Sequence, residues 1–114
     1  MPIPKKLRAA DNSTIRVETR AGFIRDPDAR VVGRHYPSPG NKHNRVVVST
    51  IQSPSSTRET LWHELLHDSA ARGGVKNNKV VERILDSLDG WSLGLLRKNP
   101  ELRDYLFEDT EESP

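Results

Sequence analysis

The periodicity of the apolar residues changes at Ser53-Pro54-Ser55-Ser56, and this change limits the chain to one class of fold. Before it, alternating or continuous β-branched residues predict three short strands, at 14–19, 30–36 and 45–51. After it, apolar residues recur with helical spacing. Strands that precede the helices, rather than alternating with them, favour the α+β class. We therefore expect a small, about three-stranded antiparallel sheet packed on two main helices.

Local signals set the expected ends of the helices. Ser56 and Glu59 have the three-residue separation of a capping box, which predicts a helix start. Either Asn77 or Asn78 would cap a second helix. Asn99-Pro100-Glu101 combines an Asn cap, a proline at the first helical position and an acid in the first turn. The predicted helices span about 56–71, 77–95 and 99–107.

The length and composition favour one small domain. The chain has 114 residues, within the size of a single typical domain. Only 33% of the residues are hydrophobic, so we expect a small core, to which a bound metal would add stability. We expect residues 1–12 to form a flexible basic arm, 13–107 the single domain, and 108–114 a disordered acidic tail.

Several classes of protein are disfavoured by the same composition. No apolar run approaches the roughly 20 residues of a membrane helix, so we expect no membrane partner. Residues 1–6 lack the apolar stretch of a secretory signal, which favours a cytoplasmic protein. Residues 1–60 carry 11 Lys+Arg against 5 Asp+Glu, but these basic residues are scattered. Nucleic acid is therefore not expected as the main partner, and the sequence leaves the oligomeric state open.

His63-Glu64-Leu65-Leu66-His67 is an H-E-x-x-H motif inside the first predicted helix. Because positions i and i+4 share one face of a helix, His63 and His67 can bind the same metal ion. Glu64 lies beside that face, where its carboxylate can accept a proton from a water on the metal. The motif therefore predicts a zinc site with Glu64 as its catalytic base. The alternative interpretation is two ordinary surface histidines.

A catalytic zinc site needs a third protein ligand, and without cysteine this ligand must be His, Asp or Glu. Glu82 is the best candidate, because a short turn brings the second predicted helix beside the first. Asp86, one turn later, would accept a hydrogen bond from the outer nitrogen of a zinc-bound histidine. The alternative is that both acids belong to a solvated face. Asp68 should point about 100° away from the histidine face, and His35 and His43 are weaker ligand candidates.

The stretch Glu59-Thr60-Leu61-Trp62-His63-Glu64-Leu65-Leu66-His67, with Leu96-Arg97-Lys98-Asn99-Pro100-Glu101-Leu102 after it, resembles small zinc metallopeptidases of bacteriophages and prophages, within the gluzincin group. The resemblance covers roughly residues 45–103. It implies a zincin-type H-E-x-x-H helix and a second, ligand-bearing helix packed on the sheet, with zinc bound by His63, His67 and Glu82. It also implies Glu64 as general base and a restricted intracellular target.

We therefore expect a zinc-dependent metallopeptidase, a hydrolase of peptide bonds, with Zn²⁺ as cofactor and a protein or peptide as substrate. The strand at 46–51 could pair with an extended peptide if it lies at a sheet edge. Tyr36, His35, His43, Tyr105 and the arginines all qualify as the group that stabilises the oxyanion, and the sequence does not choose among them. The competing class is a non-catalytic, zinc-stabilised module that binds a host or phage factor through its basic N-terminal half.

Overall fold

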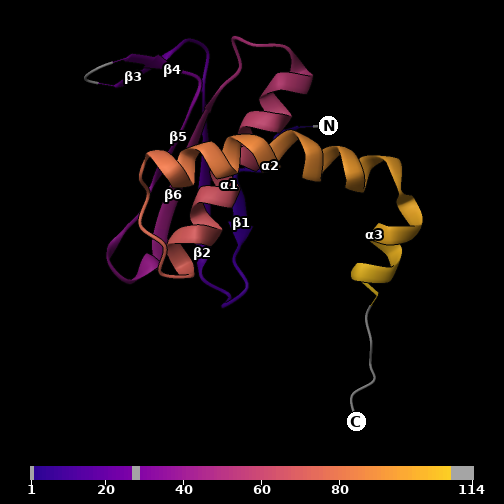
Figure 1. The fold of residues 1–114 in the computed structure, drawn as a ribbon. Helices are drawn as coiled ribbons and strands as arrows, with labels where there is room; N and C mark the ends of the chain where they lie inside the picture. The colour runs from indigo at the N-terminus through magenta and orange to yellow at the C-terminus, as the bar shows by residue number, and fades with distance from the viewer. Residues whose placement is uncertain (1, 27–28, 109–114) are drawn as a thin grey trace.

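The computed structural model describes residues 2–26 and 29–108, and it is an α+β domain, as predicted. A four-stranded mixed sheet and a separate two-stranded ribbon come first, and three α-helices follow (Figure 1). In chain order the elements are β1 (Lys6–Arg8), β2 (Thr14–Arg20), β3 (Ile24–Asp26), β4 (Ala29–Val31), β5 (Gly33–Tyr36), the 3-10 turn η1 (Pro39–Asn41), β6 (His43–Ser49), α1 (Pro54–Arg72), α2 (Lys79–Lys98) and α3 (Pro100–Leu106).

The strand order of the main sheet is β1-β2-β6-β5, and its central pair is parallel. The prediction of an antiparallel sheet is therefore wrong for β2 and β6, although β1 with β2 and β5 with β6 are antiparallel. The reason lies in the connection. The chain leaves β2, forms the β3–β4 ribbon and then β5, and returns as β6 between β2 and β5. The segment predicted as one strand at 30–36 is divided between β4 and β5.

β6 is the core of the sheet. Val46, Val47 and Val48 are all buried, so both faces of the strand are covered, as expected for an interior strand. Val46 and Val48 form one cluster with Ile15 of β2, and Leu61 and Leu65 of α1 pack against it. The condition for pairing with a peptide, a place at a sheet edge, is therefore not met by this strand. The edges of the main sheet are β1 and β5.

α1 begins at Pro54, two residues before the predicted start at Ser56. The side chain of Ser53 accepts a hydrogen bond from the backbone N–H of Ser56 at 3.1 Å, so Ser53 is the cap and Pro54 occupies the first turn. Proline is favourable there because it lacks the N–H that would otherwise be unpaired. The predicted capping box, which needs Ser56 outside the helix, is therefore wrong.

The starts of the other two helices agree more closely with prediction. Asn78 caps α2, and its side chain accepts from the N–H of Val81 at 2.9 Å. α3 begins at Pro100, as predicted, but the side chain of Asn99 does not cap it. Its amide instead donates to the carbonyl of Leu95 at 2.9 Å, at the end of α2.

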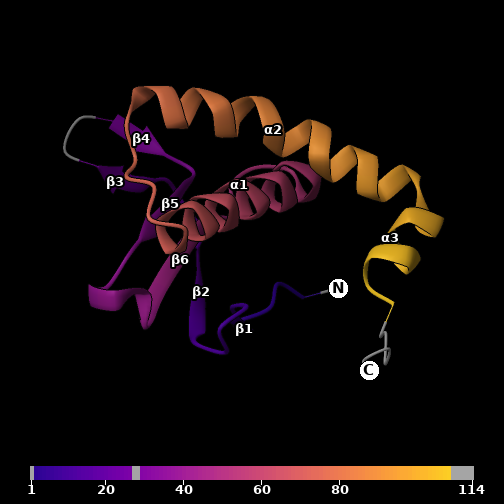
Figure 2. The same cartoon turned by 60° about the horizontal axis from the view of Figure 1, so that its bottom comes forward.

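The elements form three layers, with α1 between the sheet and α2 (Figure 2). α2 approaches α1 closely at Gly90, where a Cβ atom would lie 2.9 Å from Glu59 Oε1. The C-terminal part of α2 and all of α3 stand away from the sheet, so the molecule is elongated, 51 × 32 × 29 Å. Within the residues that are placed, no helix combines the length and the hydropathy needed to cross a bilayer.

The predicted ends of the domain have different outcomes. Lys6–Arg8, inside the segment predicted as a flexible arm, forms β1 and pairs with β2. Residues 109–114, which make up most of the predicted disordered tail, lie outside the described residues.

Candidate metal centre

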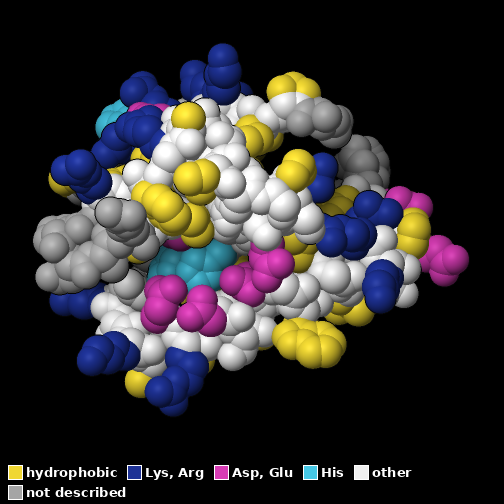
Figure 3. Space-filling view, turned by 90° about the horizontal axis from the view of Figure 1, so that it is seen from above, with side chains coloured by type: hydrophobic (Ala, Val, Ile, Leu, Met, Phe, Trp, Pro, Cys, Tyr) yellow, Lys and Arg dark blue, Asp and Glu magenta, His cyan; other side chains and the backbone are white. Residues whose placement is uncertain are grey.

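α1 and α2 bring the three predicted metal ligands together. His63 Nε2 lies 2.9 Å from Glu82 Oε1, and His67 Nε2 lies 2.7 Å from Glu82 Oε2. The two Nε2 atoms are 3.2 Å apart. The motif helix supplies both imidazoles from one face, and the first turn of α2 supplies the carboxylate. From above, histidine side chains lie in a hollow between acidic side chains, with lysines and arginines farther out (Figure 3).

The donor set and the spacing of the two imidazoles fit a zinc ion, and the Glu82 oxygens, 2.7 and 2.9 Å from the Nε2 atoms, would move outward by about 0.5 Å to bind it. Zinc binds nitrogen and oxygen at about 2.0–2.2 Å, so neighbouring ligand atoms of a tetrahedral site are roughly 3.3–3.5 Å apart. The 3.2 Å between the Nε2 atoms of His63 and His67 is close to this value. One candidate atom from each of the three residues lies within 4.8 Å of the others. Two imidazoles and one carboxylate are also a donor set typical of catalytic zinc, in which a fourth position stays open.

The outer nitrogen of His63 contacts two carboxylates of α2. Asp89 Oδ2 lies 2.9 Å from His63 Nδ1, and Asp86 Oδ1 lies 3.5 Å from the same atom. We predicted Asp86 for this role, but Asp89 is closer and its side chain is 13% exposed, against 64% for Asp86. Asp89 was not among the residues predicted for the site. Its spacing could have revealed it, because Asp89 lies seven residues, almost two full turns, after Glu82 and so shares its face.

Glu64 is buried beside the three candidate ligands, under β5. A Cβ atom at Gly33 would lie 2.9 Å from Glu64 Oε2 and would also collide with Thr60 Cγ2. Burial raises the pKa of Glu64 to about 7, although the charge of His63 opposes the shift. A carboxylate with a pKa near 7 can both accept and return a proton at neutral pH, as a general base must. A divalent cation alongside would favour its charged form.

The two histidines differ in their electrostatic surroundings. Burial lowers the pKa of His67. Burial also acts to lower the pKa of His63, but the negative charges of Glu64 and Glu82 and the hydrogen bond with Asp89 outweigh it, so that pKa is raised. An Nδ1–H that donates to Asp89 leaves Nε2 free to bind a metal. The same carboxylate would make the imidazole a stronger metal ligand.

Two adjoining clefts meet at this centre. The larger, of about 750 Å³, lies between β5, the C-terminal half of α1 and the loop from α1 to α2. The smaller, of about 530 Å³, lies on the side of Asp86 and Asp89. Gly33, Glu64 and Glu82 line both clefts. A groove therefore passes the candidate metal ligands along β5, and an extended chain could lie in it.

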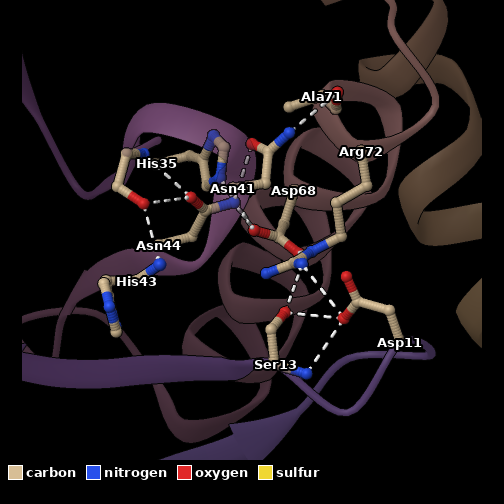
Figure 4. A network of polar contacts seen from close by, with 10 residues as sticks. Asp11, Ser13, His35, Asn41, His43, Asn44, Asp68, Ala71 and Arg72 are labelled. Carbon is tan, nitrogen blue, oxygen red and sulfur yellow. Dashed lines mark hydrogen bonds and ion pairs between the residues drawn. The ribbon is translucent and has the colours of Figure 1, made fainter.

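Asp68 points away from the histidine face, as predicted, and enters a buried polar network (Figure 4). Asn44 Nδ2 and Arg72 Nε each donate to its carboxylate at 2.6 Å, and His35 Nε2 lies 3.0 Å from it. Arg72 also donates to Ser13 Oγ at 2.6 Å. Burial opposes the charged form of Asp68, but these hydrogen bonds outweigh it and lower its pKa. The network joins α1 to the starts of β2 and β6 and to β5.

The other candidates from the sequence lie at different distances from the centre. His35 and Arg34, both on β5, line the larger cleft. The guanidinium of Arg45 lies over the Tyr36 ring, with its central carbon 4.2 Å from the centroid of that ring. His43 is exposed at the start of β6, outside the residues that line either cleft.

Comparisons with known proteins identify no relative. No protein-family model matches the chain, and no curated protein and no solved structure matches it either. The resemblance to phage and prophage metallopeptidases therefore stays a prediction.

Proposed function

We propose that this chain is a zinc-dependent metallopeptidase, with His63, His67 and Glu82 as zinc ligands. The observation that carries the proposal is the convergence of these three side chains on one point beside Glu64, at the junction of two clefts. When bound, zinc would polarise the substrate carbonyl and lower the pKa of a water molecule.

In this proposal Glu64 handles the proton of the reaction. Its carboxylate accepts a proton from the attacking water and later gives it to the nitrogen of the departing amine, as the C–N bond of the peptide breaks. Its buried position beside His63 limits competition from bulk water. Asp89 holds the His63 ring through Nδ1 and so keeps Nε2 directed at Glu82.

The proposed substrate is a protein or peptide segment in extended conformation. β5 is an edge strand, and alternate backbone groups of an edge strand point away from the sheet. An extended peptide could pair with them and pass Glu64 in the groove. The pairing considered for the strand at 46–51 is therefore proposed for β5 instead, because β6 lies in the interior of the sheet. Arg34 and His35, which line the larger cleft, are the proposed candidates for stabilising the oxyanion.

The test combines zinc content with peptide hydrolysis. A mixture of unstructured peptides is incubated with the purified, zinc-loaded protein, and new termini are identified by mass spectrometry. We expect the wild type to bind one zinc per chain and to cleave. Glu64→Gln should keep the zinc and lose cleavage by roughly 10²–10⁴-fold. Glu101→Gln, at an exposed position on α3 that lines neither cleft, is the matched control and should keep both properties. Unchanged cleavage in Glu64→Gln would overturn the proposal.

A second candidate function is a zinc-stabilised binding module without catalysis. It is favoured by the small core, since only seven apolar side chains are buried among the described residues. A small core gains more from a structural metal than a large one does. The same experiment separates the two functions. A wild type that binds zinc, gains stability from it and yields no new termini would favour the binding module.

A further inference from the structure

α2 exposes an apolar face that the described residues of the chain leave uncovered. Ile84, Leu88, Trp91 and Leu95 are each at least half exposed, and Trp91 is 85% exposed. The face that packs on α1 is a different one, with buried Leu85 and with Ser92, which accepts a hydrogen bond from Trp62. Contiguous exposed apolar side chains of this size are uncommon on a monomer and mark interaction surfaces.

The spacing of the four residues is that of a helix pair. Separations of four, three and four residues, from Ile84 to Leu95, are those of positions a and d in a coiled-coil seam. The flank of the seam away from α1 has only small residues, Ser87 and Gly94. A Cβ atom at Gly94 would meet nothing within 4 Å, so another helix can approach there. The surface therefore fits a second helix.

The seam is also complementary to itself. In an antiparallel pair of identical helices, Ile84 of one copy faces Leu95 of the other, and Leu88 faces Trp91 of the other. In both pairs the two residue numbers add to 179, so the pairs share one midpoint along the helix. A single two-fold axis through that midpoint therefore relates all four contacts. No charged residue lies in the seam between Ile84 and Leu95, so the pairing buries no unpaired charge there.

The exposed apolar area of the seam approaches the apolar share of a standard interface. An aromatic side chain buries about 150–250 Å². Trp91, which is 85% exposed, thus offers roughly 150–200 Å². The half-exposed aliphatic residues of the seam add roughly 200 Å². A standard interface takes about 800 Å² per partner, of which about 60% is apolar.

We propose that the protein forms a two-fold homodimer through an antiparallel pairing of α2 with α2 of a second copy. Residues 109–114, Asp-Thr-Glu-Glu-Ser-Pro, are polar or acidic except for Pro114. The sequence of this segment therefore offers almost no apolar side chain for the seam. Glu82 lies six residues before Leu88, roughly 120° around the helix, so the metal centre faces away from the seam. The inference is independent of the proposed catalysis.

The first test measures molar mass in solution by sedimentation over a series of concentrations. We expect twice the 12.9 kDa of one chain. Ile84→Glu should give a monomer, because each copy would place a carboxylate against Leu95 of the other. The matched control is Ile51→Glu, at a position outside α2 with 51% exposure against 50% for Ile84, and it should remain a dimer. A monomeric wild type, or two variants that behave alike, would overturn the proposal.

The second test fixes the orientation and does not depend on how well Ile84→Glu folds. Because the chain contains no cysteine, introduced thiols can pair only with each other. We expect Ile84→Cys with Leu95→Cys to form a disulfide-linked dimer on mild oxidation. Ile84→Cys alone should not, since antiparallel pairing holds the two copies of position 84 roughly 16 Å apart. Cross-linking by the single variant, or none by the double variant, would overturn the antiparallel seam.

Discussion

At the scale of single residues, a small difference in distance to Nδ1 decides which of two carboxylates holds the His63 ring. Asp89 and Asp86 both belong to the face of α2 that meets α1, but Asp89 makes the shorter and more buried contact with Nδ1. A buried hydrogen bond to an ionised group is stronger than an exposed one, which water and salt weaken. Asp89 is therefore the residue that positions the ring.

This difference predicts unequal effects on zinc affinity. Asp89→Asn should weaken zinc binding by roughly 10–100-fold, because the amide is a poorer acceptor for Nδ1–H. Asp86→Asn, the matched substitution on the same helix, should have a smaller effect. The measurement is a zinc titration against a competing chelator. Equal losses in the two variants would contradict the assignment of Asp89.

Gly33 gives a second prediction at this scale. An alanine at position 33 would place its Cβ against Thr60 and 2.9 Å from Glu64 Oε2, so β5 or the Glu64 side chain must shift. We expect Gly33→Ala to cost about 1–3 kcal/mol of the free energy of unfolding. It should also reduce any peptidase activity more than it reduces zinc content.

The control for this prediction is Gly22→Ala. A Cβ atom there would meet nothing within 4 Å, so stability and activity should be retained. Urea unfolding and the peptide assay measure the two effects. If Gly33→Ala is as stable as Gly22→Ala, the close approach of β5 to α1 does not contribute to the free energy of unfolding.

At the scale of elements, the polar network around Asp68 fixes α1 on the sheet. Its members come from α1, β5 and β6, and the apolar core beneath is small. Removal of the carboxylate leaves the Arg72 guanidinium and the Asn44 amide without their buried acceptor. Unpaired buried polar groups are costly, because they have lost water and gained no partner.

We therefore expect Asp68→Ala to lower the free energy of unfolding by about 3–5 kcal/mol, the usual cost of breaking a buried ion pair. Asp104→Ala, at an exposed position on α3, should change it by less than about 0.5 kcal/mol. Urea titration followed by circular dichroism gives both values. A small effect of Asp68→Ala would mean that water replaces the carboxylate in the network.

At the scale of the whole molecule, the proposed zinc ion links two layers that few buried side chains hold together. Leu85 is the one buried apolar residue of α2 among those described, and His63 and Glu82 face each other across the same interface. A ligand that binds only the folded state stabilises it according to its concentration and affinity.

Removal of zinc should therefore lower the melting temperature. At free zinc 100 times its dissociation constant, the stabilisation is about 2.7 kcal/mol. For a domain of this size, that corresponds to a shift of roughly 10–20 °C. Calorimetry with zinc, with chelator, and with zinc restored measures it, and Glu82→Ala should abolish most of the shift. A melting temperature unaffected by zinc would contradict the proposed site.

The sequence by itself determined the features that depend on neighbours along the chain. The α+β class, the three helices and the shared face of His63 and His67 follow from periodicity and capping, which are local properties of the backbone. The proximity of Glu82 to that face also followed, because the turn between the helices is short. The start of α1 was misplaced because two serines three residues apart offered competing caps.

Only the tertiary structure decided the features that depend on distant partners. The parallel pairing of β2 and β6 and the burial of Asp68 against Asn44 each join segments more than 20 residues apart, and the first of them places β6 in the interior of the sheet. Local periodicity shows that a strand exists but not which strand lies beside it, because strand pairing is selected by the packing of the whole core. The choice of Asp89 over Asp86 is of the same kind, since both acids share the helix face, and the rotation of α2 against α1 separates them.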